Sequence, residues 1–270
     1  MGTKARRTPP RTRVRLLLRC QAAVGRLPPP LRIPWIGLWL GLLDRRDLHA
    51  LDGACYDGWA EYHGSEHNRR GLWPWEERAL DAHFPTEGRF LVVAAGGGRE
   101  ALALVARGYA IHGCECHPDL LRVAQKRLAE VAPGARLLPS PRDGLAAPTR
   151  DYDGAFLGWG AHSLVAGRGR RVDLLTSLGR HLRPGAPVLL SFLAHIGRAP
   201  GLRAIAPVAN AVRRFRRRAP VERGDTLAPN FVHVFDRPGI LAEVDAAGFD
   251  VVDDRVDDDA YPHLVARRRT

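Results

Sequence analysis

Cysteine, lysine and long apolar segments are all scarce in this chain of 270 residues. The four cysteines, Cys20, Cys55, Cys114 and Cys116, are too few and too unevenly spaced for the disulfide framework of a small secreted protein. The most apolar segment, residues 33–43, is interrupted by one proline and two glycines, and it is far shorter than the roughly 18 residues that a membrane span requires. The sequence therefore argues against a disulfide scaffold and against a membrane span.

Recognised targeting signals are also missing from the first residues. Leu16, Leu17 and Leu18 form too short an apolar run for the core of a signal peptide. Arg6 stands where an N-myristoylation motif requires serine or threonine. We therefore expect a cytoplasmic protein.

Acidic residues are outnumbered by basic ones. The chain has 41 Lys+Arg and 29 Asp+Glu, a net charge of +12 and a sequence pI near 10.6. Only Lys4 and Lys126 are lysines, so nearly all of this charge is arginine. Such an excess permits an anionic partner, but it is equally typical of a general drift towards arginine in a composition rich in alanine and glycine. The sequence alone leaves both explanations open.

Three regions differ in composition along the chain. Residues 1–30 are rich in arginine and proline, and we expect them to be a partly disordered leader. Residues 31–88 are rich in tryptophan and tyrosine and are predicted to form an N-terminal helical cap. From residue 89 to residue 270, apolar runs of strand length alternate with helical patterns, which indicates an α/β core.

The α/β core is predicted to be a Rossmann-like, doubly wound and mostly parallel sheet of about seven strands, with an antiparallel C-terminal strand. A basic segment at about 194–223 interrupts this alternation and is predicted to be a helical insertion that covers the substrate. The expected strands are 89–94, 110–115, 136–139, 152–158, 187–193, 249–252 and 263–266.

Three consecutive glycines follow the first expected strand. Gly96, Gly97 and Gly98 stand where a buried strand turns into a helix, and glycine there allows positive φ angles and close approach of a ligand to the main chain. Glu115 ends the next expected strand, where a carboxylate can accept both ribose hydroxyls of an adenosine. The pattern indicates an adenosine-containing cofactor. Because Gly96, Gly98 and Ala101 also satisfy the dinucleotide fingerprint, the turn alone does not exclude NAD.

Five segments in order resemble the motifs of class I S-adenosylmethionine-dependent methyltransferases, with a match that is continuous from about Tyr56 to the C-terminus. The resemblance implies methyl transfer from S-adenosylmethionine. The segments are AGGGREALAL (95–104), GYAIHGCECHPDLL (108–121), DYDGAFLGWG (151–160), LRPGAPVLLSF (182–192) and FVHVFDRPGILAEVDAAGF (231–249).

The resemblance also implies which residues contact the cofactor. Ala95 and the three glycines would line its methionine and ribose parts, and Glu115 would bind the ribose. Cys116 or His117 would border the adenine together with Arg142 and Asp143, and Gly158 and Trp159 would border the sulfonium, a cation that suits an aromatic face. The sequence departs from the family at Ala94, where many members have an acidic residue, and at Glu115, where aspartate is commoner.

Catalytic residues are harder to assign because methyl transfer depends mainly on alignment of the reacting atoms and exclusion of water. Tyr56 and Tyr62 precede the core, where this family often has a helix that closes over the cofactor. His162, His195 and His233 are candidates for a general base. Each of these side chains has an alternative role in packing.

Two further motifs have structural and functional interpretations. The run from His112 to His117 contains four potential metal ligands, but zinc sites usually need a second, distant ligand pair, and we predict no metal. The arginine run 213–218 could bind phosphate or a nucleic acid backbone, but it lacks aromatic residues arranged for base stacking. We therefore expect a small-molecule acceptor, for which an acidic compound is one candidate, and regard nucleic acid as the less favoured partner; the oligomeric state is not predicted.

Two other functions remain as alternatives. An NAD(P)-dependent oxidoreductase is disfavoured because the sequence has no Tyr-x-x-x-Lys or comparable hydride-transfer set. A non-catalytic binding protein on the same fold is disfavoured because a scaffold needs neither the glycine turn nor Glu115. The favoured prediction is an enzyme, an S-adenosylmethionine-dependent methyltransferase.

Overall fold

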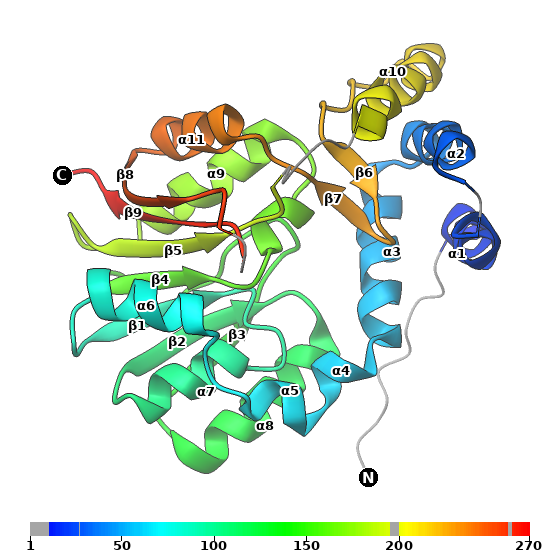
Figure 1. Cartoon of the computed structure of the whole chain (residues 1–270). Helices are drawn as coiled ribbons and strands as arrows, with labels where there is room; N and C mark the ends of the chain where they lie inside the picture. The colour runs from blue at the N-terminus through cyan, green and yellow to red at the C-terminus, as the bar shows by residue number, and fades with distance from the viewer. Residues whose placement is uncertain (1–10, 27, 195–199, 259–260) are drawn as a thin grey trace, which may run out of the picture. The chain divides into compact units, whose positions relative to one another are not determined.

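The computed structural model of the chain describes residues 11–26, 28–194, 200–258 and 261–270 (Figure 1). The chain forms two compact units: unit 1 consists of Met1–Gly58 and Ala199–Phe231, and unit 2 of Trp59–Arg198 and Val232–Thr270. Among the described helices, none combines the length and the apolarity needed to cross a bilayer.

Unit 2 contains a seven-stranded sheet with the order β3-β2-β1-β4-β5-β9-β8. The first five strands in this order are parallel to their neighbours, and β9 runs antiparallel between β5 and β8. This topology confirms the predicted doubly wound, mostly parallel sheet. The strands are β1 (Arg89–Val93), β2 (Ala110–Glu115), β3 (Arg136–Pro139), β4 (Gly154–Leu157), β5 (Pro187–Ser191), β8 (Phe249–Arg255) and β9 (His263–Arg268).

Both faces of the sheet are covered by helices, which explains why the central strands read as continuous apolar runs. Along β1, Phe90 and Val92 belong to one hydrophobic core, whereas Leu91 and Val93 belong to the other, because successive strand residues point to opposite faces. Figure 1 shows α9 and α11 on one face of the sheet and α6, α7 and α8 on the other.

The helices of unit 2 alternate with its strands, as the sequence pattern predicted. Strand order reverses between β1 and β4, and this switch point places the turns after β1, β2 and β4 around one crevice. The helices are α4 (Ala60–His63), α5 (Ser65–Arg69), α6 (Pro74–His83), α7 (Arg99–Ala106), α8 (Pro118–Val131), the 3-10 helix η1 (Ala161–Leu164), α9 (Arg168–Gly179) and α11 (Arg237–Ala246).

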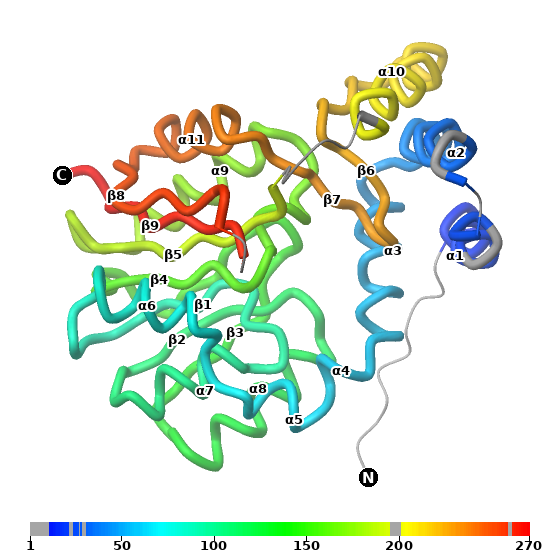
Figure 2. Tube along the Cα trace, in the orientation of Figure 1, coloured from blue at the N-terminus to red at the C-terminus, as the bar shows by residue number. Residues whose placement is uncertain are grey.

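Unit 1 combines two segments that are distant in the sequence. Its elements are α1 (Thr12–Val24), α2 (Pro29–Leu42), α3 (Arg45–Gly58), α10 (Pro200–Phe215) and β6 (Asp225–Leu227); β6 pairs with β7 (Phe231–His233), within which the boundary between the units falls. Figure 2 shows α2 in blue beside α10 in yellow. The two helices approach closely because Gly37 and Gly41 have no side chains: a Cβ there would lie 2.7 Å from Val208 Cβ and 2.6 Å from Val212 Cβ, respectively.

The predicted division of the chain differs from the observed one. Residues 12–24, assigned to a disordered leader, form helix α1, in which Val14 and Leu17 are buried in a core. Residues 59–88, assigned to the cap, belong to unit 2. Residues 200–223 of the predicted insertion belong to unit 1 together with the N-terminal helices. Residues 195–199 lie outside the described ranges.

Candidate functional site

The glycine turn connects β1 to α7 as predicted, and its backbone is unusual. Ala94, Gly96 and Gly98 have φ angles of 54°, 54° and 98°, all in the left-handed region that favours glycine. A Cβ on Gly96 would meet no atom within 4 Å. The main chain at Gly96 therefore faces open space, which is the property that a ligand approaching the backbone requires.

At positions 97 and 98, glycine is required for a different reason. A Cβ on Gly97 would lie 2.4 Å from Asn68 Oδ1 and 2.5 Å from the Tyr62 carbonyl oxygen, so α4 and α5 pack directly on this residue. A Cβ on Gly98 would lie 3.1 Å from Ala124 Cβ on α8. Of the three glycines, only Gly96 leaves room for a ligand, and the other two allow helices to contact the turn.

Glu115 lies at the end of β2, beside the glycine turn. Its Oε2 accepts a hydrogen bond from the Gly96 N–H at 2.8 Å, and its Oε1 accepts one from the His117 N–H at 2.6 Å. The side chain is buried. Each oxygen retains a second lone pair, so the carboxylate is fixed in position and can still accept a hydroxyl.

A cavity of about 70 Å³ lies at the carboxyl ends of the parallel strands. Cys116, Arg142 and Asp143, which the sequence assigned to the adenine, all line it, together with Ala94 at the end of β1. Leu157, Leu164 and Val165 supply apolar wall on the opposite side. These residues come from the turns after β1, β2, β3 and β4, and the fold alone brings them together.

Burial changes the ionisation of the groups in this cavity. Burial lowers the pKa of Arg142 to about 10, and the Asp143 carboxylate partly counteracts the shift. Burial also raises the pKa of the Cys116 thiol, which therefore stays protonated near neutral pH. The thiol sulfur accepts a hydrogen bond from Arg142 Nη1 at 2.9 Å. The cavity thus has one cation, one carboxylate, a neutral thiol and the Ser140 side chain on a mostly apolar wall.

Gly158 and Trp159 follow β4, next to the glycine turn. A Cβ on Gly158 would lie 2.3 Å from the Ala94 carbonyl oxygen, so only glycine allows the two strand ends to approach this closely. Trp159 belongs to an aromatic cluster: its ring centroid lies 6.2 Å from that of His67, 5.9 Å from Trp73 and 5.4 Å from Tyr261. Sequence reasoning found Trp159 but missed the other three, because no motif surrounds them.

Two indole N–H groups in this cluster have no hydrogen-bond partner. The Nε1 atoms of Trp73 and Trp159 are both buried and unsatisfied. A buried donor without a partner is costly and uncommon in native proteins. The cluster therefore combines apolar aromatic surface with unused hydrogen-bond donors, beside the turn that faces open space at Gly96.

A buried ion cluster joins α6 to the first residue of α7. Arg99 donates to Glu76 Oε1 and Oε2 at 2.6 Å each, to Glu100 Oε1 at 2.8 Å and to the Gly71 carbonyl at 2.9 Å. Its side chain is 2% exposed. Because Arg99 directly follows the glycine turn, this cluster fixes the segment that carries His67 and Trp73 relative to Gly96.

The catalytic candidates have different positions. Tyr62 lies on α4, half-buried against His67, and burial is the main reason that its pKa is raised. His162 is fully buried, its Nε2 lies 3.2 Å from Glu243 Oε2, and its ring stacks on Phe235. No part of its surface is accessible, so His162 is a core residue in this structure rather than a group that reaches an acceptor.

The remaining candidates lie elsewhere. Tyr56 is half-buried on α3 in unit 1, His233 is buried on β7, and His195 lies outside the described residues. Within the metal-like run, His112 Nδ1 hydrogen-bonds the Tyr152 hydroxyl at 2.8 Å and Cys114 is fully buried. Among the described residues, the run from 112 to 117 forms no cluster of three metal ligands.

Comparisons with known proteins agree with the topology. No protein-family model and no curated protein matches the sequence. A SAM-dependent methyltransferase from Methanosarcina mazei is similar in structure, with a TM-score of 0.56, 16% identity, and coverage of 74% of this chain and 99% of the other.

Two further solved structures indicate what the fold can support. An amino pentose methyltransferase from Micromonospora echinaspora, solved with SAM bound, has a TM-score of 0.51 and 16% identity and covers 79% of this chain and 96% of its own. The cyclase SpnF has a TM-score of 0.54 and 16% identity, with coverage of 82% and 96%. The chain therefore has the fold of the class I S-adenosylmethionine-dependent methyltransferases.

Proposed function

We propose that the chain binds S-adenosylmethionine at the glycine turn and transfers its methyl group to a small molecule. The observation that carries the proposal is the pairing of open main chain at Gly96 with the Glu115 carboxylate, whose Oε2 accepts the Gly96 N–H. A tight turn without a ligand needs neither the open space nor a buried carboxylate at the end of the next strand.

The residues around the turn suit the chemistry of this cofactor. Glu115 has lone pairs left to accept the two ribose hydroxyls. Asp143 can accept from the exocyclic amine of adenine, and Cys116 and Leu157 offer apolar surface to the ring, since all three line the cavity. S-adenosylmethionine supplies a methyl group on a positively charged sulfur, ready for displacement by a nucleophile.

The chain's own contribution to the reaction is positioning and exclusion of water. Trp159 and Trp73 lie beside the turn, and their faces favour a positively charged sulfur over bulk solvent. Tyr62 and Tyr261 extend the same aromatic surface and are half-buried, which supports a role for them in contacting an acceptor. Because His162 is inaccessible, we propose no histidine base there, and the acceptor must carry its own nucleophilic atom in a reactive form.

Calorimetric titration tests the cofactor directly. We expect S-adenosylhomocysteine to bind the full chain and Glu115→Ala to weaken this binding by about 1.5–3 kcal/mol, the range for a lost hydrogen bond to a charged group. Gly96→Val is expected to abolish binding, because the branched side chain fills the space that the ligand needs and is strained at φ 54°.

Matched variants separate binding from folding. Glu87 is an exposed carboxylate in the loop before β1, and Glu87→Ala should titrate like the wild type. Gly98→Val is not suitable as a binding probe, because its side chain would strike α8 at Ala124. Tighter binding of NAD than of S-adenosylhomocysteine would overturn the assignment and favour an oxidoreductase.

A further inference from the structure

The net positive charge of the chain is located entirely in unit 1. The 91 residues of unit 1 include 18 Lys+Arg and 6 Asp+Glu, which accounts for the whole net charge of +12. Unit 2 has 23 residues of each sign and is neutral. A drift towards arginine across the whole sequence does not produce this separation, so the charge of unit 1 needs an explanation of its own.

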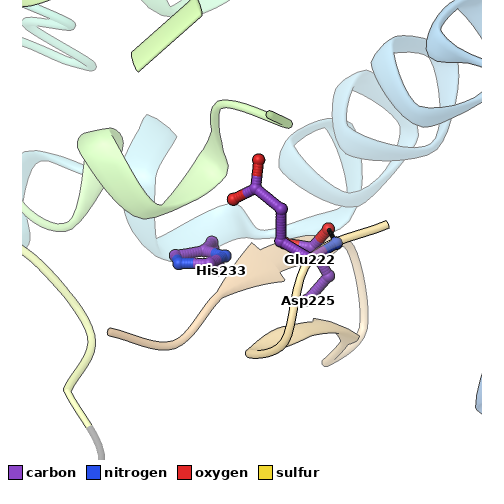
Figure 3. Close-up of side chains that lie close together, drawn as sticks. All are labelled: Glu222, Asp225 and His233. Atoms are coloured by element: carbon purple, nitrogen blue, oxygen red, sulfur yellow. Dashed lines mark hydrogen bonds between the residues drawn. The ribbon is translucent and has the colours of Figure 1, made fainter. Parts of the chain in front are cut away.

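Three of the six acidic residues of unit 1 are buried. Asp47, Asp52 and Asp225 are at most 3% exposed. Asp225 Oδ2 accepts the Glu222 N–H at 2.8 Å (Figure 3), and Asp52 accepts a hydrogen bond from Asn230. These three carboxylates make contacts inside the unit, and most of the exposed ionisable side chains of unit 1 are arginines.

Exposed apolar side chains accompany these arginines. Phe215 is 89% exposed and stands within the run of five arginines at 213–218. On α2, Leu31 and Leu38 are 58% and 40% exposed, and with the exposed Pro34 between them they share one helix face, at spacings of three and four residues. On α1, Leu16 is 52% exposed and lies between the exposed Arg15 and Arg19.

We propose that unit 1 docks the protein on the surface of an anionic lipid bilayer. Helices that lie in a membrane interface combine arginine or lysine on a polar face with leucine and phenylalanine that enter the acyl boundary. Polybasic segments contribute about 1 kcal/mol for each arginine near an anionic surface. Nucleic acid is the less suitable occupant, because aliphatic side chains on α1 and α2 gain nothing from phosphates and offer no stacking surface to bases.

The arginines at the end of α10 have two different roles. Arg213 donates to the Leu40 and Leu43 carbonyl oxygens, and Arg218 donates to the Leu42 carbonyl oxygen at 2.9 Å, so both bind the carboxyl end of α2. Arg214, Arg216 and Arg217 are exposed instead. Of the five arginines in this run, these three are available to a bilayer without disturbing the unit.

Vesicle flotation of the full-length chain tests the proposal. We expect binding to vesicles containing about 30% phosphatidylserine, weak binding to pure phosphatidylcholine, and loss of binding as salt rises. Replacement of Arg214, Arg216 and Arg217 by Gln should reduce the partition coefficient by about 100-fold. Phe215→Ser should reduce it by about 10-fold, the effect of losing one buried aromatic side chain.

Control variants isolate the role of unit 1. Arg136, Arg150 and Arg180 are exposed arginines of unit 2, and changing all three to Gln removes the same charge. We expect this variant to bind vesicles like the wild type, and circular dichroism should show both triple variants folded. An equal loss of vesicle binding in the two triple variants would overturn the proposal. Self-association through Phe215 without vesicle binding would also overturn it, and so would tighter binding to single-stranded RNA than to vesicles.

Discussion

The two units use arginine in opposite ways. In unit 2, Arg99 and Arg171 are at most 2% exposed and each is bound to a buried glutamate, Glu76 and Glu243 respectively. In unit 1, lysine and arginine together outnumber acidic residues 18 to 6, and many of the arginines face solvent. Arginine therefore forms buried ion pairs in unit 2 and contributes surface charge in unit 1. Overall composition does not distinguish these roles; position in the fold does.

A second contrast concerns how the helices are brought together. In unit 2, helices pack on a sheet whose strands are largely consecutive in the chain. In unit 1, α2 and α10 are more than 150 residues apart and pack through Gly37 and Gly41. At Gly37 and Gly41 this interface has no room for a side chain, so its stability depends strongly on single positions.

The largest expected effect is at the buried Arg171–Glu243 ion pair of unit 2. Arg171 donates to both carboxylate oxygens of Glu243, so Arg171→Ala leaves a buried carboxylate without its cation. We expect this change to lower the free energy of unfolding by about 3–5 kcal/mol. Urea denaturation measures the loss. Arg180→Ala, at an exposed arginine of the same unit, should change the free energy of unfolding by less than about 0.5 kcal/mol. Equal losses in the two variants would contradict the distinction between buried and surface arginines.

An intermediate effect is expected at the α2–α10 interface of unit 1. A Cβ on Gly41 would lie 2.6 Å from Val212 Cβ and 2.8 Å from the Ala209 carbonyl oxygen, so Gly41→Ala forces the helices apart. We expect a loss of about 1–3 kcal/mol, the range for overpacking, seen as faster hydrogen exchange in α10. Gly53→Ala is the matched control on α3, where nothing lies within 4 Å and alanine should stabilise the helix by about 1 kcal/mol. Stabilisation by both changes would contradict close packing of α2 on α10.

The smallest effect concerns the pH dependence of unit 2. Burial lowers the pKa of His162 below its ordinary value of 6.5, even though Glu243 favours the charged form. As pH falls below about 6.5, the unfolded chain takes up a proton at His162 and the folded chain does not, so stability decreases. His162→Gln should make this decrease shallower by at most about 1.4 kcal/mol per pH unit.

Denaturation at pH 7.5 and at about pH 5.5 measures that slope. Burial also lowers the pKa values of His67, His112 and His263, so part of the dependence should remain in the variant. A variant with the slope of the wild type would show that His162 is protonated in the folded chain, and it would reopen a role for this residue in proton transfer.

Some features followed from the sequence because they depend on neighbours in the chain. The strand β1 is readable from five apolar residues in a row, and the turn after it from three glycines. The position of Glu115 at the end of β2 followed from the apolar run before it. The resemblance assigned Cys116, Arg142 and Asp143 to one part of the cofactor, and the fold brings them to one cavity. The cofactor assignment and the roles of these residues remain predictions.

Other features could not be read from the sequence. Nothing in the sequence around His162 indicates that it is buried. Its buried partner, Glu243, is 81 residues away in the chain. His67, Trp73 and Tyr261 surround Trp159 without a shared motif. Gly97 and Gly98 were assigned to the ligand together with Gly96, but the helices that they contact come from elsewhere in the chain.

The sequence by itself determined the alternation of strands and helices in unit 2, the glycine turn and the total charge, because periodicity, backbone freedom and composition are local or additive properties. The tertiary structure decided which glycine faces open space, which histidine is buried and which arginines meet solvent. It also decided that residues 200–231 join the N-terminal helices. As a result, the net positive charge is concentrated in one unit. Burial and pairing depend on groups that are distant in the chain, and only the folded packing brings those groups within reach of one another.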